Sequence, residues 1–269
     1  MDSMNSLVIG NTSQLGRYFP DTFHKISSRD IDFSLYENLF FDRIYVTFAE
    51  QRTFIENSDE IFSDVNYFYT IKVIEFFSKI CNKLIYYSTT ELWNNENGEI
   101  SIDTPFNYNI SSYISSKYLM TEFILSKRKY NEWANVVILY PFNFNSIYRK
   151  DGFLFSKIFD SIINNKEIEI GDTYFYRELI HPKYVVEKSL KCVDDQIVGS
   201  GRLVHINDFI RSLYKYFDVD YNKYVKENKN NNINLKRNIF YLNSKDEQYF
   251  ELFNDTINEI KREKNIISK

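Results

Sequence analysis

Residues 6–19 read SLVIGNTSQLGRYF. Three apolar residues, Leu7 to Ile9, run into Gly10, and a second glycine, Gly16, follows six residues later. The chain has only 7 glycines in 269 residues, so a pair this close together indicates a strand that turns into a helix through a tight loop. Taken alone, the stretch fits either a nucleotide-binding loop or an ordinary strand–helix turn.

Strand and helix patterns alternate beyond this loop. A short helix is expected near 13–18, and longer helical patterns occur at 66–80 and 113–126. Between and around these helices lie strand-like runs at 22–26, 43–48, 83–87 and 135–140. This alternation predicts an α/β fold, a Rossmann-type doubly wound parallel sheet with helices on both faces. We expect residues 1–145 to form this dinucleotide-binding domain. Residues 146–269 should form mainly a small C-terminal α/β substrate lobe, with some segments returning to the first domain.

Composition excludes several classes of function. The net charge is −4, so nucleic-acid binding has no electrostatic support. No apolar run reaches the length of about 18 residues that a membrane helix needs, and the first residues lack the pattern of a signal peptide. Cys81 and Cys192 are isolated, and the three histidines have no metal-ligand spacing. A cytoplasmic protein without a bound metal is the expectation.

Three motifs occur in a fixed order along the chain. Gly10-x-x-Ser13-x-x-Gly16 follows the first strand, Ser88-Thr-Thr-Glu-Leu-Trp93 follows a middle strand, and Tyr113-Ile-Ser-Ser-Lys117 opens a helix. Together they resemble the extended short-chain dehydrogenase/reductase family, and most closely its members that act on nucleotide-diphosphate sugars. Smaller matches are Asn66 to Thr70, the run from Tyr140 to Asn143, and Arg177 to His181. The resemblance extends to about residue 217.

The resemblance implies that the chain binds a nicotinamide dinucleotide. NADP(H) is favoured because Arg29 after the second strand can pair with a 2′-phosphate, but Asp30 stands beside it and NAD(H) is possible. Ser13 replaces the family's middle glycine, so its hydroxyl would crowd a pyrophosphate slightly or donate to it. The implied cofactor contacts, besides Lys117, are Gly10, Thr12, Ser13, Gln14, Leu15, Gly16, Arg29, Phe48 and Ala49.

The same resemblance implies a catalytic role for Tyr113, Lys117 and Thr89. A free phenol has a pKa of about 10, too high for proton transfer near neutrality. Lys117 lies one helical turn after Tyr113, so a nearby ammonium can stabilise the tyrosinate. Thr89 would hydrogen-bond the substrate carbonyl. The alternative is that Tyr113 is one of 22 tyrosines and simply packs at a helix N-terminus.

Roles for Glu91 and His181 stay open. Glu91 occupies the place of the catalytic Cys of epimerising reductases, and the dehydratases' Asp before it is Thr90 here. Glu91 and His181 could therefore move a proton at C3 or C5 of a sugar, or only orient it. Asn143, Arg177 and Lys183 are candidate substrate ligands, with surface ion pairing as the alternative for the two cations.

These observations together predict an NADPH-dependent reductase of the 4-keto group of a nucleotide-diphosphate 6-deoxy sugar, serving bacterial surface (capsular) polysaccharide synthesis. One alternative is an NAD-dependent epimerase or dehydratase. Another is a catalytically silent protein that binds a nicotinamide dinucleotide, since Ser13, Tyr140 and Lys183 depart from the family pattern. A homodimer is expected, because family members often pair through helices like 66–80 and 113–126.

Overall fold

The computed structural model describes residues 5–228, 240–242 and 249–267. The chain divides into two compact units. Unit 1 comprises residues 1–92, 105–141 and 183–198, and unit 2 comprises residues 93–104, 142–182 and 199–269. The chain therefore leaves and re-enters the first unit twice.

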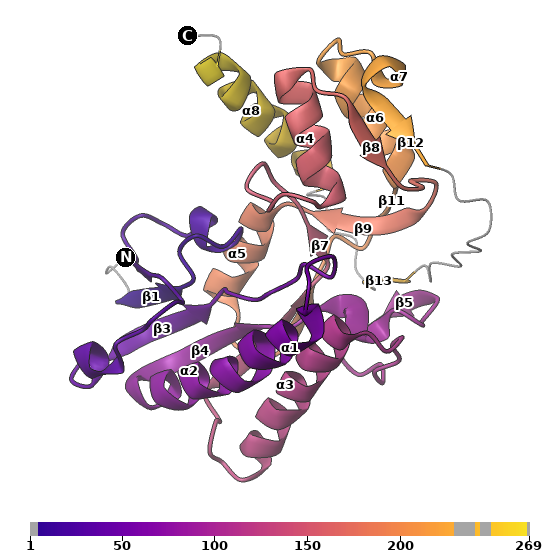
Figure 1. Cartoon of the computed structure of the whole chain (residues 1–269). Helices are drawn as coiled ribbons and strands as arrows, with labels where there is room; N and C mark the ends of the chain where they lie inside the picture. The colour runs from indigo at the N-terminus through magenta and orange to yellow at the C-terminus, as the bar shows by residue number, and fades with distance from the viewer. Residues whose placement is uncertain (1–4, 229–239, 243–248, 268–269) are drawn as a thin grey trace. The chain divides into compact units, whose positions relative to one another are not determined.

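A six-stranded parallel sheet forms the centre of unit 1 (Figure 1). Its strand order is β10-β6-β4-β3-β1-β2, and every pairing in it is parallel. The strands are β1 (Ser6–Ile9), β2 (His24–Ile26), β3 (Phe41–Val46), β4 (Cys81–Tyr87), β6 (Val136–Pro141) and β10 (Gln196–Val198). The predicted Rossmann-type parallel sheet is confirmed. The inner strands are almost entirely buried, which explains their continuous apolar runs.

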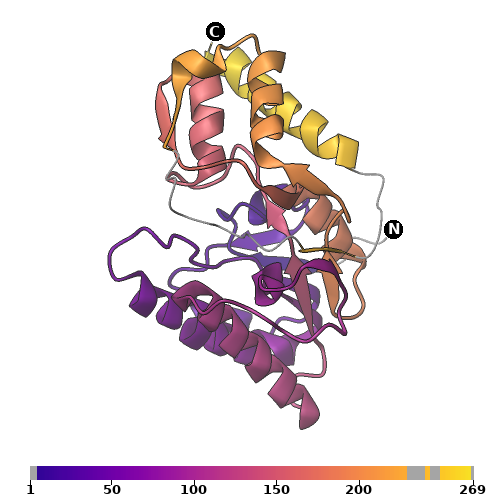
Figure 2. The same ribbon diagram turned by 90° about the vertical axis from the view of Figure 1, so that its right-hand side faces the viewer.

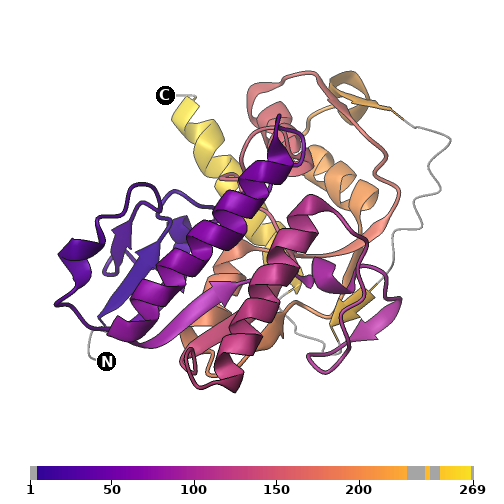
Figure 3. The ribbon, with the colours of Figure 1, turned by 60° about the horizontal axis from the view of Figure 1, so that its bottom comes forward.

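A long helical segment and helix α3 pack side by side on one face of this sheet (Figures 1 and 3). The segment consists of α1 (Ser58–Ser63), the π-helix η3 (Asp64–Tyr69), α2 (Thr70–Phe77) and η4 (Ser78–Ile80). Helix α3 runs from Ser112 to Lys129 and starts at Ser111, whose hydroxyl accepts a hydrogen bond from the Ile114 amide. Helix α5 (Pro182–Lys191) lies on the other face, where Arg43 of β3 donates to the Ser189 carbonyl.

The crossovers at the start of the chain differ from the prediction. A helix near residues 13–18 was expected, but the structure has only one 3-10 turn there, η1 (Gly16–Tyr18). The next crossover likewise contains only the 3-10 turn η2 (Phe33–Tyr36). Only fourteen residues separate β1 from β2, too few to complete a helix that also returns to the sheet. No long helix with a strong dipole therefore follows β1 in this described stretch.

Unit 2 has its own apolar core, and Figure 2 shows the ribbon of its helices from a second side. Its helices α4 (Leu154–Asn164), α6 (Ile206–Tyr216) and α8 (Tyr249–Ile267) contribute Ile158, Ile210 and Ile260, each fully buried. Strands β7 (Asn143–Phe144), β9 (Tyr176–Ile180) and β11 (Leu203–His205) form a three-stranded sheet. The remaining elements are β5 (Gly98–Ile100), η5 (Thr90–Trp93, shared with unit 1), β8 (Ile168–Ile170), α7 (Tyr221–Tyr224), β12 (Val225–Glu227) and β13 (Phe240–Leu242).

Beyond residue 146 the sequence pattern predicts short strands, helices and a polar loop. The strands are expected at 167–170, 178–180 and 202–206, the helices at 153–164, 184–193 and 208–217, and the loop at 226–233. Most of these strands and helices are present with shifted ends.

The predicted polar loop at 226–233 begins within β12, and its residues from 229 lie outside the described part of the chain. The sequence also predicts a polar, fraying last helix around 246–263. The structure has α8 at Tyr249–Ile267, and the expected start before Tyr249 lies outside the described part, which omits residues 243–248. Among the helices of the described ranges, none is both long and apolar enough to cross a bilayer.

Candidate active site

Lys117 lies under the sheet-facing side of α3 and is only 3% exposed. Its ammonium donates to the main-chain oxygen of Tyr87 at 2.8 Å and to the hydroxyl of Tyr86 at 3.4 Å. It also lies 4.9 Å from the centre of the Tyr86 ring. Burial lowers the pKa of Lys117 to about 7 from an ordinary value of 10.5. Near neutral pH this lysine can therefore exist with or without its proton.

Tyr113 lies one turn before Lys117 on the same helix and is partly exposed. Its ring packs edge-on against Phe62 of α1, with ring centres 5.7 Å apart. Burial raises the pKa of Tyr86 well above its usual value, and the charges of Tyr113 and Tyr140 raise it further. Tyr113 and Lys117 thus both lie close enough to Tyr86 to interact with it.

Three hydroxyl residues end strand β4, and only one of them is left for a ligand. The Ser88 hydroxyl pairs with that of Thr121 on α3 at 2.8 Å, and Thr90 donates to the Pro141 carbonyl at 3.4 Å. Thr89 Oγ1 instead accepts a hydrogen bond from the Glu91 amide at 3.2 Å. Within the described residues the Thr89 hydroxyl has no acceptor for its own proton. The Thr89 hydroxyl is therefore available to donate to a ligand.

Asn66 connects helix α3 to the loop after β3. Its side-chain oxygen accepts from the Glu50 amide at 2.8 Å, and its nitrogen donates to the Glu50 carbonyl and to Ser116 Oγ. Ser116 in turn donates to the Tyr113 carbonyl at 2.7 Å. Asn66 lies in the π-helix η3, a rare element that is frequent at functional sites. The sequence indicated Asn66 as a family match but not these partners.

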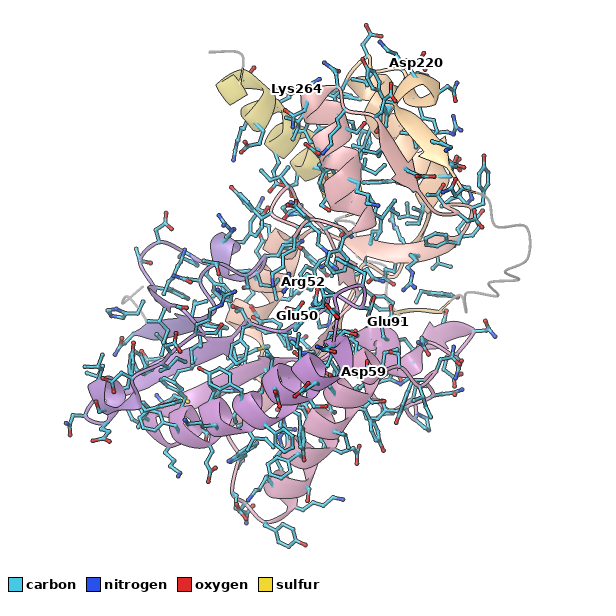
Figure 4. The ribbon with its side chains drawn as sticks, viewed as in Figure 1. Glu50, Arg52, Asp59, Glu91, Asp220 and Lys264 are labelled. Atoms are coloured by element: carbon cyan, nitrogen blue, oxygen red, sulfur yellow. The ribbon has the colours of Figure 1, made fainter. Side chains whose placement is uncertain are left out.

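The loop after β3, which contains Glu50, is also held by an ion pair between Glu50 and Arg52. Glu50 Oε2 lies 2.7 Å from Arg52 Nη2, and Glu50 Oε1 accepts from the amides of Gln51 and Arg52 (Figure 4). The loop begins with Phe48 and Ala49, two predicted cofactor contacts. The Phe48 ring lies 5.6 Å from that of Tyr69. This loop is therefore fixed at both its main chain and its side chains.

The opening glycine loop is tightly constrained at both glycines. Gly10 has a φ of +106°, a conformation that favours glycine. A Cβ atom on Gly16 would lie 2.3 Å from the Gly10 carbonyl oxygen, so only glycine fits there. The amides of Gly10 and Asn11 both donate to the Ile26 carbonyl. These bonds fasten the loop to the end of β2.

Ser13 has internal partners in this loop. Its hydroxyl donates to Thr47 Oγ1 at 2.9 Å and accepts from the Gly16 amide at 2.9 Å. Thr47 lies 3.0 Å from the Ile9 and Gly10 carbonyls. The proposed donation from Ser13 to a phosphate is therefore replaced by a hydroxyl chain that closes the loop.

The remaining polar groups of the loop fit a pyrophosphate. In the described part of the chain, the amides of Thr12 and Leu15 have no acceptor, and the buried side-chain oxygen of Asn11 has no donor. Unsatisfied amides in a glycine-containing turn form an anion-binding concavity. Gln14, between Ser13 and Leu15, is partly buried. The loop can thus hold a dinucleotide phosphate through its main chain rather than through a helix dipole.

Arg29 lies in an exposed loop directly after β2. Its amide donates to Ser27 Oγ, and the carbonyl of Ser28 accepts from the Tyr69 hydroxyl at 2.6 Å. The neighbouring Asp30 has a φ of +54°, so the chain turns sharply here. The guanidinium is therefore presented from a fixed turn, as selection of a 2′-phosphate would require.

Glu91 is the second residue of the short turn η5 and is partly buried (Figure 4). The other predicted substrate residues are distributed over the two units. Unit 2 holds Asn143 at the start of β7, Arg177 on β9, and the buried His181 directly after β9, whereas Lys183 on α5 belongs to unit 1. Their substrate roles stay predictions.

Two partners of predicted site residues, one in each unit, were not found from the sequence. Glu259 of α8 lies 3.1 Å from His181 Nε2, and Tyr86 lies against Lys117. Glu259 is separated from His181 by 78 positions in the chain, in a helix expected to be polar and frayed, so no spacing connects them. Tyr86 is one aromatic residue in an apolar strand, and only the alternation of strand faces could have placed it toward α3.

Among the described residues, no group of three or more His, Cys, Asp or Glu side chains is arranged to hold a metal ion. The candidate site is thus organised around a lysine, a tyrosine and a threonine. Its components come from the end of β4 and the first turns of α3, the usual place for ligands in an open parallel sheet.

No protein-family model matches the sequence, and no curated protein matches it. Solved structures, in contrast, match its fold over nearly the full length. UDP-N-acetylglucosamine 4-epimerase from Methanobrevibacter ruminantium M1, in complex with UDP-N-acetylmuramic acid, aligns with a TM-score of 0.77 at 14% identity, covering 97% of this chain and 99% of the epimerase.

Two further matches have similar scores. RMD from Pseudomonas aeruginosa, complexed with NADPH, aligns with a TM-score of 0.76 at 14% identity, covering 97% of this chain and 99% of RMD. UDP-glucuronic acid 4-epimerase from Bacillus cereus, with UDP-glucuronic acid and NAD, aligns with a TM-score of 0.76 at 16% identity, covering 98% of this chain and all of the epimerase. The chain therefore has the Rossmann-type fold of these proteins.

Proposed function

We propose that this protein is an NADPH-dependent reductase of the extended short-chain dehydrogenase/reductase family. Its substrate would be the 4-keto group of a nucleotide-diphosphate 6-deoxy sugar. The observation that carries the proposal is the arrangement at β4 and α3: Lys117 is buried against the Tyr86 side chain and the Tyr87 main-chain oxygen, Tyr113 lies one turn away, and the Thr89 hydroxyl is available as a donor. A packing role for Tyr113 alone does not account for a buried lysine next to it.

The residues divide the work of such a reduction. The nicotinamide, when bound, supplies the hydride. Thr89 donates a hydrogen bond to the substrate oxygen, and Tyr113 gives a proton to that oxygen as charge develops on it. Lys117, when protonated, stabilises the tyrosinate that remains and can hold a ribose hydroxyl. The Gly10–Gly16 loop would hold the pyrophosphate, and Arg29 would favour NADP(H), with NAD(H) as the alternative.

An epimerase that retains NAD is the second candidate. Two of the three compared structures are 4-epimerases, and one of them is bound to NAD. Glu91, two residues after Thr89, offers a carboxylate for proton transfer at the sugar. The buried His181 of unit 2 offers an imidazole for the same purpose. Such an enzyme would return the hydride to the same sugar and consume no cofactor.

The two candidates are separated by one screen. Purified protein is mixed with NADPH and several nucleotide-linked 4-keto sugars, and absorbance at about 340 nm, where the reduced nicotinamide absorbs, is followed. Oxidation that depends on one sugar supports the reductase. Absence of oxidation together with NAD released on denaturation supports the epimerase. Binding of NADPH without either reaction would support the catalytically silent dinucleotide-binding protein.

We further propose that two copies of the chain pair through α3 and η3. Phe68 on η3 is 63% exposed and Leu119 on α3 is 50% exposed. Tyr67 and Phe123 join the two elements with ring centres 6.2 Å apart. Apolar side chains on adjacent helices are a surface that self-association would cover. A role in cytoplasmic synthesis of a bacterial surface polysaccharide completes the proposal.

A further inference from the structure

Tyr86 and Tyr87 point to opposite faces of the central sheet. Both are buried in β4, and burial raises the pKa of each well above its usual value. The Tyr87 side chain lies near Ser189 of α5, whereas Tyr86 faces α3. Tyr86 is 1% exposed, and its hydroxyl and its ring both contact the Lys117 ammonium. One residue thus gives Lys117 two different kinds of contact.

Lys117 depends on these contacts because it has no carboxylate partner within the described residues. An ammonium has three protons to donate, and here the Tyr87 carbonyl and the Tyr86 hydroxyl accept from it. Burial is the cause of its lowered pKa, with no acidic side chain of the described ranges to offset it. In a desolvated site the face of an aromatic ring attracts a cation more strongly than in water. The Tyr86 ring and hydroxyl therefore oppose the loss of the Lys117 proton.

We propose that Tyr86 is a positioning residue for the proposed reaction: its ring and hydroxyl hold the protonated Lys117 side chain in place beside Tyr113. The inference rests on the proposed function. The titratable groups near this pair come from three elements, namely Tyr86 on β4, Tyr113 on α3 and Tyr140 on β6. Tyr113 is the proposed proton donor, and Tyr140 is buried.

The direction of the effect follows from the charge. The form of Lys117 that stabilises tyrosinate is the ammonium, so an activity that needs it falls as pH rises through the Lys117 pKa. Tyr86→Leu removes the ring and the acceptor, and the pKa should fall by about one pH unit. Tyr86→Phe keeps the ring, and the fall should be smaller. Tyr87→Phe, a matched change on the other sheet face, should leave it unchanged.

The first measurement needs no substrate. The pKa of Lys117 is read from the ¹³Cε chemical shift of lysine-labelled full-length protein between about pH 5 and pH 10, with the signal assigned by its loss in Lys117→Met. We expect the order wild type, Tyr86→Phe, Tyr86→Leu from higher to lower pKa. Equal values in wild type and both Tyr86 variants would overturn the proposal. If Tyr86→Leu does not fold, Tyr86→Phe decides alone.

The second measurement separates this proposal from the proposed function. The pH profile of kcat/KM for NADPH-dependent reduction should lose its high-pH part in the Tyr86 variants, with Tyr87→Phe unaffected. If wild type turns over no 4-keto sugar but the NMR order holds, the proposed function fails while the Tyr86–Lys117 partnership stands. If turnover is present and neither the titration nor the profile moves, the positioning role fails and the reductase stands.

Discussion

His181 Nε2 lies 3.1 Å from Glu259 Oε1, and both side chains are buried in unit 2. The second oxygen of Glu259 accepts a hydrogen bond from the Ile147 amide at 3.3 Å. One carboxylate thereby joins the end of β9 and the segment after β7 to helix α8. Sequence alone suggested that His181 acts on substrate or is simply structural. The structure gives it a buried partner that serves either role.

Replacing Glu259 by Leu should lower the free energy of unfolding by about 1–3 kcal/mol, because His181 and the Ile147 amide each lose a buried partner. Urea unfolding followed by circular dichroism measures this. Glu263→Leu, four residues later on the same helix, is the control and should change stability little. Equal effects of the two substitutions would show that the His181 contact contributes nothing.

Tyr113→Phe should reduce turnover by at least about 100-fold, because it removes the proposed proton donor while keeping the ring that packs on Phe62. The melting temperature and the dissociation constant for NADPH should change little. Tyr118→Phe is the matched control, since the Tyr118 ring packs on Phe106 and Tyr108 of the same unit. Unchanged turnover in Tyr113→Phe would remove this residue from the mechanism.

Lys117 should make stability depend on pH. Its pKa in the folded protein is about 7, below the ordinary 10.5, so between these values the unfolded chain holds more protons and stability rises with pH. Below about pH 7 both states are protonated and the cost of burying the charge is complete. Lys117→Met should remove this dependence of stability on pH. The variant should be more stable than wild type at low pH, and this difference in unfolding free energy should shrink by about 2 kcal/mol between about pH 6 and pH 9. Urea titrations at the two pH values measure it, and parallel slopes would contradict it.

Gly16→Ala should destabilise the protein by about 2 kcal/mol or more, because the added Cβ would lie 2.3 Å from the Gly10 carbonyl oxygen. Gly171→Ala is the control, since a Cβ there meets nothing within 4 Å. Thermal unfolding compares the two, and NADPH affinity should fall in Gly16→Ala only. A tolerated Gly16→Ala would show that the loop is not closed as described.

Phe68→Glu or Leu119→Glu should convert a dimer to a monomer, because a charge in a dry apolar interface is costly. Light scattering coupled to size-exclusion chromatography gives the mass. Leu35→Glu, at a residue that is 68% exposed and lies outside α3 and η3, should leave the mass unchanged. A wild-type protein that is already monomeric at micromolar concentration would contradict the proposed pairing.

The sequence predicted the central sheet well because its strands are buried on both faces. Runs such as 43–48 and 135–140 are rich in apolar residues, and the structure places strands at Phe41–Val46 and Val136–Pro141. The short helix expected near 13–18 is reduced to the 3-10 turn Gly16–Tyr18, because the glycine spacing indicates a turn but does not determine the length of the helix after it. The π-helix at Asp64–Tyr69 was hidden within an otherwise regular apolar periodicity.

Side-chain partners were harder to predict than elements. Ser13 departs from the family pattern, and the sequence could not show that its hydroxyl faces Thr47, 34 positions away. Lys117 could be placed on the same helix face as Tyr113, but its burial against Tyr86 depends on how α3 packs on β4. Contacts of this kind arise from tertiary packing, which local spacing does not encode.

The interrupted path of the chain through unit 1 has a consequence for synthesis on the ribosome. Strand β10 and most of α5 belong to unit 1 but are translated after residues 142–182. Until Asp195 is translated, Arg128 cannot donate the two hydrogen bonds that its guanidinium makes to the Asp195 carboxylate. The Ile138 amide, which donates to the same carboxylate, lacks this acceptor as well. A nascent chain that stops at Pro141 therefore carries an open β6 edge, exposed to chaperones or to pairing with other chains.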